Sequence, residues 1–220
     1  MYLFGPNVNA IETCNIPEQN ITTVKSSSQS DIVKPMVIQI IVGSVRKTST
    51  GDKIGKIIKS MADKRPEIST EILKVTDFNI PTYVDETNPA SRESEITDPI
   101  LKRWSDKIKE ADGYIIIAPE YNSGYPGPLK NAIDSLYKEW NNKPVALVGY
   151  SGGPSGGTSM LEQLRQVLSK GLKMIPVATE IKIPSSWKAF NLQGDLIQPN
   201  IEQNLNSMID QLLAAKVTKK

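Results

Sequence analysis

From residue 37 onward, short runs of apolar and β-branched residues alternate with segments whose apolar residues recur at helical spacing. The runs predict five strands, at 37–42, 70–75, 114–118, 145–148 and within 173–183. Repeated strand–helix units with short connections are typical of a parallel sheet, because the right-handed crossovers place helices on both of its faces. The pattern therefore predicts an α/β fold.

Apolar spacing predicts five helices, around 54–61, 100–108, 129–140, 160–168 and 201–212. Five strands and five helices favour a flavodoxin-like three-layer sandwich, with a five-stranded parallel sheet of order 2-1-3-4-5. The alternating polarity of 70–75 places that strand at an edge, whereas the apolar run 114–118 is expected in the centre. In this order a ligand crevice forms at the carboxyl ends of strands one and three.

The length of 220 residues suits one such domain, predicted at 36–220. Residues 1–35 are polar and non-periodic, so we expect a flexible or loosely packed extension, with an ordered arm as the alternative. Residues 79–99 hold three prolines and form a long connection, which is usually functional or a partner contact.

Composition excludes several classes of function. The chain has no histidine, so His-based triads, His-ligated zinc and haem held by a proximal His are ruled out. The single cysteine, Cys14, forms no internal disulfide and suits a reducing compartment. A net charge of +2 indicates neither nucleic acid nor an anionic membrane as a partner. Without a membrane-spanning run, signal peptide or transit peptide, the expected location is cytoplasmic.

The first loop, 43–49, lies between the first predicted strand and helix. It offers the hydroxyls of Ser44, Thr48 and Ser49 and the guanidinium of Arg46. A helix N-terminus adds N–H donors and a favourable dipole for an anion. The loop therefore predicts a phosphate site, with an ordinary helix cap as the alternative.

The second loop, 119–127, follows the central strand. Two prolines stiffen it, and Gly124 and Gly127 allow close backbone approach. Tyr121 or Tyr125 supplies an aromatic face for a planar ring. The alternative is a proline-rich turn whose tyrosines cover the core.

The third loop, 151–157, is rich in glycine. Its glycines match the GxxxxG spacing of a phosphate loop, but Thr158 replaces the lysine that nucleoside triphosphates require, so nucleotide binding is a weak alternative. A turn over which a ring lies flat fits better, and a loop without a ligand remains open. Three polar loops at one sheet edge predict a phosphate-bearing planar ligand, which we interpret as flavin mononucleotide (FMN).

Side chains for proton transfer are lacking near these loops. No nucleophile elbow, metal-spaced cluster or acid–base pair is present, and Glu120, Lys130 and Asp134 are interpreted as solvated or ion-paired. Such a protein suits a cofactor that performs the chemistry itself, so we expect no catalytic side chain.

The three loops, in this order, resemble motifs of the NAD(P)H-dependent FMN reductase family, which includes quinone, azo-dye and chromate reductases. The motifs are G-S-x-R-x-x-S at 43–49, P-E-Y-N-x-x-x-P-G-x-L-K-N-x-x-D at 119–134 and S-G-G-x-x-G-G at 151–157. The resemblance covers residues 36–215. It implies hydride transfer from NADPH or NADH to N5 of bound FMN, and then reduction of a quinone, dye or free flavin, with ping-pong kinetics.

The resemblance also implies the FMN-binding residues: Ser44, Arg46, Thr48, Ser49, Pro119, Glu120, Tyr121, Asn122, Ser123, Ser151, Gly152, Gly153 and Gly156. Gly51 departs from the pattern, because many relatives carry Asn there, and Thr48 or Thr50 is expected to replace that contact. A homodimer or homotetramer is implied, with 79–99 and the third helix as candidate interface. The alternative function is a flavin-binding electron carrier or redox-sensing interaction protein, although the near-neutral charge disfavours a carrier.

Overall fold

The computed structural model describes residue 1 and residues 34–215. Its centre is a five-stranded parallel sheet of order β2-β1-β3-β4-β5, as predicted. The strands are β1 (Met36–Val42), β2 (Ile68–Lys74), β3 (Gly113–Pro119), β4 (Pro144–Tyr150) and β5 (Ile175–Ile183). The extension predicted at 1–35 falls mainly on residues 2–33, which lie outside the described residues.

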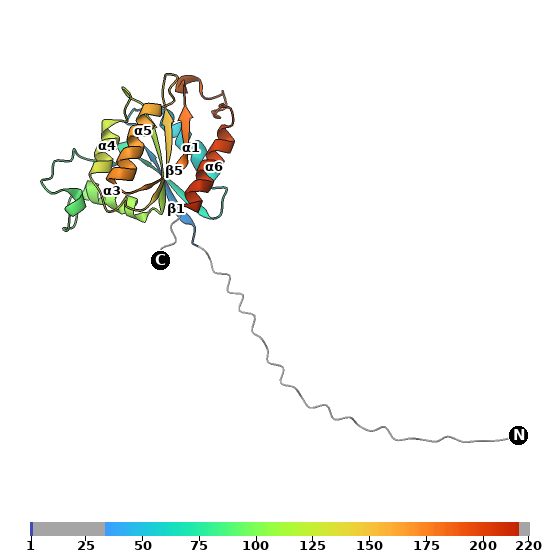
Figure 1. Cartoon of the computed structure of the whole chain (residues 1–220), viewed down its shortest axis with the longest axis horizontal. Coiled ribbons are helices and arrows are strands. Elements are labelled where there is room, and N and C mark those ends of the chain that lie inside the picture. The colour runs from blue at the N-terminus through green and yellow to red at the C-terminus, as the bar shows by residue number, and fades with distance from the viewer. Residues whose placement is uncertain (2–33, 216–220) are drawn as a thin grey trace. The chain divides into compact units, whose positions relative to one another are not determined.

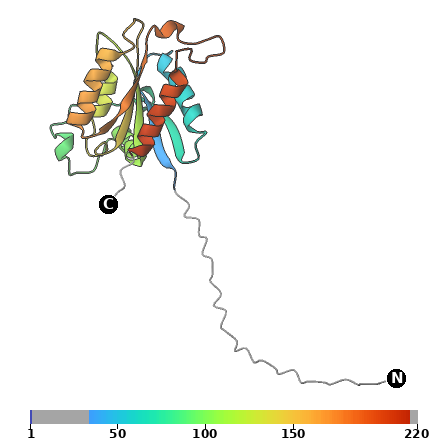
Figure 2. The same cartoon turned by 45° about the vertical axis from the view of Figure 1, so that its right-hand side comes forward.

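Helices cover both faces of the sheet, as Figure 1 and the turned view in Figure 2 show. The α-helices are α1 (Thr50–Ala62), α2 (Val75–Phe78), α3 (Pro99–Glu110), α4 (Gly127–Asp134), α5 (Thr158–Gln166) and α6 (Ile201–Ala214). Short helical turns are η1 (Pro89–Ser91), the π-helical η2 (Val167–Gly171) and η3 (Ser186–Lys188). Within residues 34–215, no helix is long and apolar enough to cross a bilayer.

Two apolar cores lie on opposite faces of the sheet. One packs α1 and α6 against the sheet and the other packs α2 to α5, which gives the expected three-layer sandwich. Every residue of β3 and β4 is buried, whereas β2 at the edge is only partly buried. This burial explains why 114–118 is uniformly apolar and why 70–75 alternates in polarity.

Helix α4, the third of the predicted helices, is shorter than the apolar spacing predicts. It ends at Asp134 instead of continuing to residue 140. The Ser135 hydroxyl donates to the Asn131 carbonyl (2.6 Å), and the Glu139 carboxylate accepts the Tyr137 N–H (3.2 Å), so side chains compete with helical bonding. Apolar residues in the following turns still pack into the core, which preserves the helical spacing without the helix.

Two other boundaries differ from the prediction. Val75, expected at the end of the second strand, begins the short helix α2. The fourth helix changes from α to π geometry at Val167.

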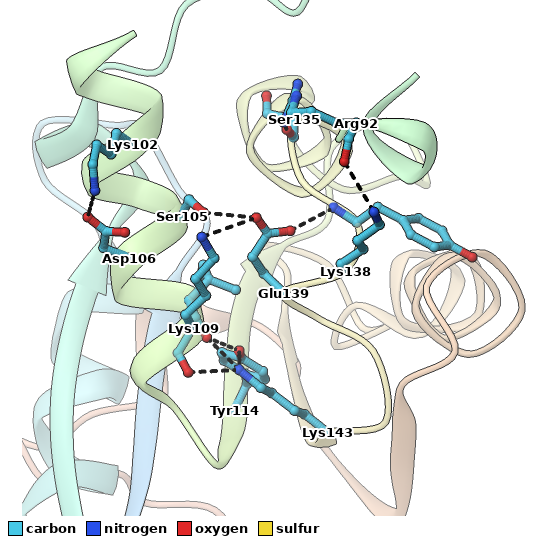
Figure 3. A network of polar contacts seen from close by, with 12 residues as sticks. Arg92, Lys102, Ser105, Asp106, Lys109, Tyr114, Ser135, Lys138, Glu139 and Lys143 are labelled. Carbon is cyan, nitrogen blue, oxygen red and sulfur yellow. Dashed lines mark hydrogen bonds and ion pairs between the residues drawn. The ribbon is translucent and has the colours of Figure 1, made fainter. Parts of the chain in front are cut away.

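A polar network fastens the segment after α4 to its neighbours (Figure 3). The Glu139 carboxylate accepts the Ser105 hydroxyl of α3 (2.8 Å). Arg92 donates to the Ser135 carbonyl (3.2 Å), and Lys138 donates to the Arg92 carbonyl (3.1 Å). The long connection between α2 and α3 is therefore attached to the segment after α4, and this segment is in turn attached to α3.

Candidate functional site

A cavity of about 260 Å³ opens at the carboxyl ends of the strands, where the three predicted loops meet. Nine of the predicted site residues line it: Ser44, Arg46, Thr48, Ser49, Pro119, Glu120, Tyr121, Ser151 and Gly152. Four others belong to the same loops but are not among the lining residues: Asn122, Ser123, Gly153 and Gly156. Thr50, expected as a possible replacement contact, also lines the cavity, and three lining residues were missed from sequence: Tyr150, Ser186 and Trp187.

The loop after β1 leads directly into the N-terminus of α1. Ser49 caps this helix, and its hydroxyl accepts the Gly51 N–H (3.1 Å). Gly43 permits a close approach to α4, since a Cβ there would lie 2.6 Å from Cδ2 of Leu129. Arg46 is exposed, and among the described residues its guanidinium has no hydrogen-bond or ion-pair partner. The loop thus presents a helix N-terminus, several hydroxyls and an uncommitted cation to one cavity.

The loop after β3 begins with a tight two-residue turn. The backbones of Tyr121 and Gly124 exchange hydrogen bonds of 2.8 and 3.0 Å. Between them, Asn122 and Ser123 adopt left-handed φ values of 49° and 64°, the geometry of a type I′ turn. The Gln163 side chain of α5 donates to the Ser123 carbonyl (2.8 Å) and holds the tip. Asn122 and Ser123 therefore shape the turn, while Tyr121 lines the cavity at its base.

The Glu120 carboxylate connects the second loop to the third. One oxygen accepts the Ser155 hydroxyl (2.8 Å), and the other accepts the Met160 N–H in the first turn of α5 (3.2 Å). Glu120 is therefore committed to holding the two loops together. The other carboxylate of this region, Asp134, pairs with Lys130, as the sequence suggested.

The glycines of the third loop divide into two kinds. No atom lies within 4 Å of where a Cβ would stand at Gly152 or Gly153, so both leave open space. Gly156 and Gly157 have φ values of +64° and +94° and pack tightly against β5 and β4, which suits them to the turn itself. The Ser151 hydroxyl stabilises this turn, because it accepts the Gly156 N–H (3.0 Å) and donates to the Gly153 carbonyl (2.9 Å).

Two of the missed residues are aromatic. Tyr150 ends β4 and is 6% exposed, and its hydroxyl lies 3.3 Å from the Ser49 hydroxyl. Its position immediately before the glycine-rich loop was the available signal. Trp187 is 76% exposed and lies outside every motif. The Ser186 N–H donates to the Ser151 carbonyl (2.9 Å), which holds this turn against the glycine-rich loop.

Comparison with known proteins supports the motif assignment. The model of the family described as NADPH-dependent FMN reductase matches residues 36–188. NAD(P)H-dependent FMN reductase LOT6 of Saccharomyces cerevisiae is 35% identical over 190 residues, which cover 82% of this chain and 96% of the relative. A quinone reductase of Pseudomonas putida is 32% identical over 136 residues, or 60% of this chain and 68% of the relative.

A solved structure is also similar over most of its length. FerB, a flavoenzyme NAD(P)H:(acceptor) oxidoreductase from Paracoccus denitrificans, has a TM-score of 0.66 and 26% identity. The match covers 82% of this chain and 97% of that structure. Fold, motifs and relatives agree, and the chain belongs to the NADPH-dependent FMN reductase family.

Proposed function

We propose that the protein is an NAD(P)H-dependent FMN oxidoreductase that reduces quinones or similar small acceptors. The observation that carries this proposal is a single cavity that combines a helix N-terminus, the uncommitted guanidinium of Arg46 and the open space beside Gly152. An anionic phosphate suits the first two features, and a flat ring suits the third.

The phosphate end of FMN would lie at the loop after β1. There the positive end of the α1 dipole would favour an anion, and Ser44, Thr48 and Arg46 would add donors. A charge-assisted bond from the planar guanidinium contributes most, because both partners are ionised.

The ring end would lie between the second and third loops. Gly152 leaves the backbone accessible on one side, and Tyr121 contributes an aromatic wall on the other. The hydrogen bonds of Glu120 to the third loop keep the two walls at a fixed separation. The described residues thus bind and orient the cofactor without a proton-transfer side chain.

Bound FMN supplies the redox chemistry, by accepting a hydride from NAD(P)H and passing electrons to an acceptor. The relatives named FMN reductase and quinone reductase support a nicotinamide donor and a quinone-like acceptor. We propose that donor and acceptor use the same open side of the cavity in turn, which gives ping-pong kinetics.

Steady-state oxidation of NADPH and NADH by the FMN-loaded protein tests this function. We expect quinone-dependent loss of nicotinamide absorbance, with parallel double-reciprocal lines as the quinone concentration is varied. Intersecting lines would exclude the ping-pong order but leave the reductase activity in place. Absence of oxidation with quinones, dyes and free flavin would reject the enzyme and favour a carrier or sensor.

We also propose a homodimer or homotetramer in the cytoplasm. The connection 79–99 and α4 are the candidate interface, and a cavity of about 600 Å³ between them includes Tyr83, Pro89 and Tyr137. Light scattering coupled to size-exclusion chromatography measures the assembly, and a monomer would reject this interface. The single cysteine, Cys14, supports the reducing location.

A further inference from the structure

We propose that the hydroxyl of Tyr150 is a further ligand for the phosphate group of FMN, in the space that Gly51 leaves open beside the cap of α1. This inference rests on the proposed function, because it concerns the same cavity. It adds a residue that belongs to none of the three sequence motifs.

The fold holds Tyr150 firmly at the phosphate end. It is the last residue of β4, and its carbonyl accepts the Glu120 N–H (2.9 Å), which fixes the backbone between two sheet loops. Its ring packs into the core beneath α1 and is 6% exposed. A rigid ring that is buried along its length and reaches the cavity can direct its hydroxyl with little loss of conformational entropy.

Gly51 makes the position of this hydroxyl possible. A Cβ at residue 51 would lie 3.2 Å from the Tyr150 oxygen and 3.1 Å from Oγ of Ser49. Any side chain there would press on both hydroxyls. Because residue 51 is a glycine, the Tyr150 hydroxyl can lie beside Ser49 at the N-terminus of α1. This is the helix end proposed to bind the phosphate.

The hydrogen-bond inventory leaves a donor for a ligand. The Ser49 hydroxyl already accepts the Gly51 N–H (3.1 Å), and it lies 3.3 Å from the Tyr150 hydroxyl. The Ser44 hydroxyl and the Gly51 N–H also interact with the Tyr150 oxygen. Each hydroxyl carries one proton, so in the arrangement in which Ser49 donates to Tyr150, the Tyr150 O–H remains free to donate to a ligand. Burial raises the pKa of Tyr150, which keeps the phenol protonated at neutral pH. An anion in the cavity would accept this remaining proton.

The comparison of FMN with riboflavin, which lacks the phosphate, isolates this contact. Tyr150→Phe should weaken FMN binding about 10-fold, the effect of one hydrogen bond to a charged group. Riboflavin affinity should change less than about twofold, because the ring site is untouched. Quenching of flavin fluorescence on titration with the apoprotein measures both constants. Tyr83→Phe is the matched control, since its hydroxyl bonds to Thr87 in the connection 79–99.

Gly51→Ala provides an independent variant, because its added methyl group displaces the two hydroxyls. It should also lower the affinity for FMN relative to riboflavin, and thermal melting would establish that both variants fold. An unchanged FMN-to-riboflavin affinity ratio in both variants would overturn the role of Tyr150 while leaving the proposed function intact. Failure of the unaltered protein to bind FMN would instead overturn the proposed function and this inference with it.

Discussion

At the scale of single residues, the cavity combines groups that are free to bind with groups that hold the loops. The Arg46 guanidinium has no partner among residues 34–215, whereas the Glu120 carboxylate is engaged by Ser155 of the third loop and by Met160 of α5. The motif 119–134 contains both kinds of group, because Tyr121 lines the cavity whereas Glu120 holds neighbouring segments together. Its Asn131 accepts the Tyr83 N–H (2.8 Å) and donates to the Pro81 carbonyl (2.9 Å), so it anchors the long connection. Motif membership alone does not distinguish a ligand from a support.

Replacing Arg46 tests the free cation. Arg46→Ala should weaken FMN binding by about 1–3 kcal/mol, the scale of a hydrogen bond to a charged group. Fluorescence titration measures the constant, and Lys47→Ala is the control, because this exposed neighbour does not line the cavity. Equal affinities in the two variants would show that Arg46 does not bind the phosphate.

Replacing Glu120 tests the support. Glu120→Gln keeps an acceptor for Ser155 but loses the second carboxylate oxygen for the Met160 N–H, so the third loop should loosen. We expect a loss of about 1–2 kcal/mol in unfolding free energy and weaker binding of both FMN and riboflavin. Urea unfolding and flavin titration measure the two effects.

The control for this change is Glu162→Gln, which alters an exposed carboxylate on α5, the helix that contains Met160. Glu120→Gln that weakens FMN binding but preserves riboflavin binding would contradict the role of Glu120 in holding the loops together. It would show that Glu120 acts on the phosphate end of the cavity.

At the scale of elements, side chains from two helices bond to the backbone of the edge strand β5 where its pairing with β4 is irregular. Its pairing with β4 shifts between Val145 and Leu147, whose partners are Pro176 and Glu180. The freed backbone groups bond to side chains instead. Gln211 of α6 accepts the Thr179 N–H (2.9 Å), and Arg165 of α5 donates to the Val177 carbonyl (2.8 Å). Both outer layers therefore stabilise the strand that leads to Trp187.

Removing one of these bonds should weaken the whole domain. Gln211→Ala leaves a partly buried N–H unsatisfied and should cost about 1–2 kcal/mol of unfolding free energy. Chemical denaturation followed by circular dichroism measures this. Gln203→Ala, at an exposed position of the same helix, should change stability by less than about 0.5 kcal/mol. Equal stability of the two variants would show that Thr179 finds another partner.

The element order was predictable because each strand and helix carries its own apolar pattern. Strand order followed from the number and succession of elements. The end of α4 at Asp134 was not predictable, because Leu136 and Trp140 stay buried and Tyr137 still packs against the core after the helix stops. The shift in β5 was also not predictable, since the groups that bond to its backbone there, Arg165 and Gln211, lie on helices distant in sequence.

The loops that line the candidate cavity were predictable where the local sequence is distinctive. The loop glycines and hydroxyls stand together in the chain, so their loops could be identified. Tyr150 resembled an ordinary strand residue until the sheet placed its hydroxyl beside Ser49, 101 residues away. Trp187 gave no signal, because only the return of β5 brings it to the cavity.

At the scale of the whole molecule, two buried tyrosines should lower the free energy of unfolding as the pH rises above about 10. Burial raises the pKa of both Tyr114 and Tyr150. Their contribution to stability is complete below the unfolded pKa of about 10 and is lost as pH rises further, because the unfolded chain releases those protons more easily.

An absorbance titration near 295 nm should show the two buried tyrosines ionising together with loss of circular dichroism, after the exposed ones. Ionisation of all seven tyrosines near pH 10 without unfolding would contradict their burial.

The central claim is that this fold binds FMN where NAD(P)H can reduce it. The most direct measurement is the visible absorption spectrum of the FMN-loaded protein, recorded anaerobically before and after addition of NADPH or NADH. We predict rapid bleaching of the flavin bands. Bound flavin that stays oxidised with both donors would contradict the reductase and favour a carrier or sensor. Absence of any bound flavin would contradict the cofactor site itself.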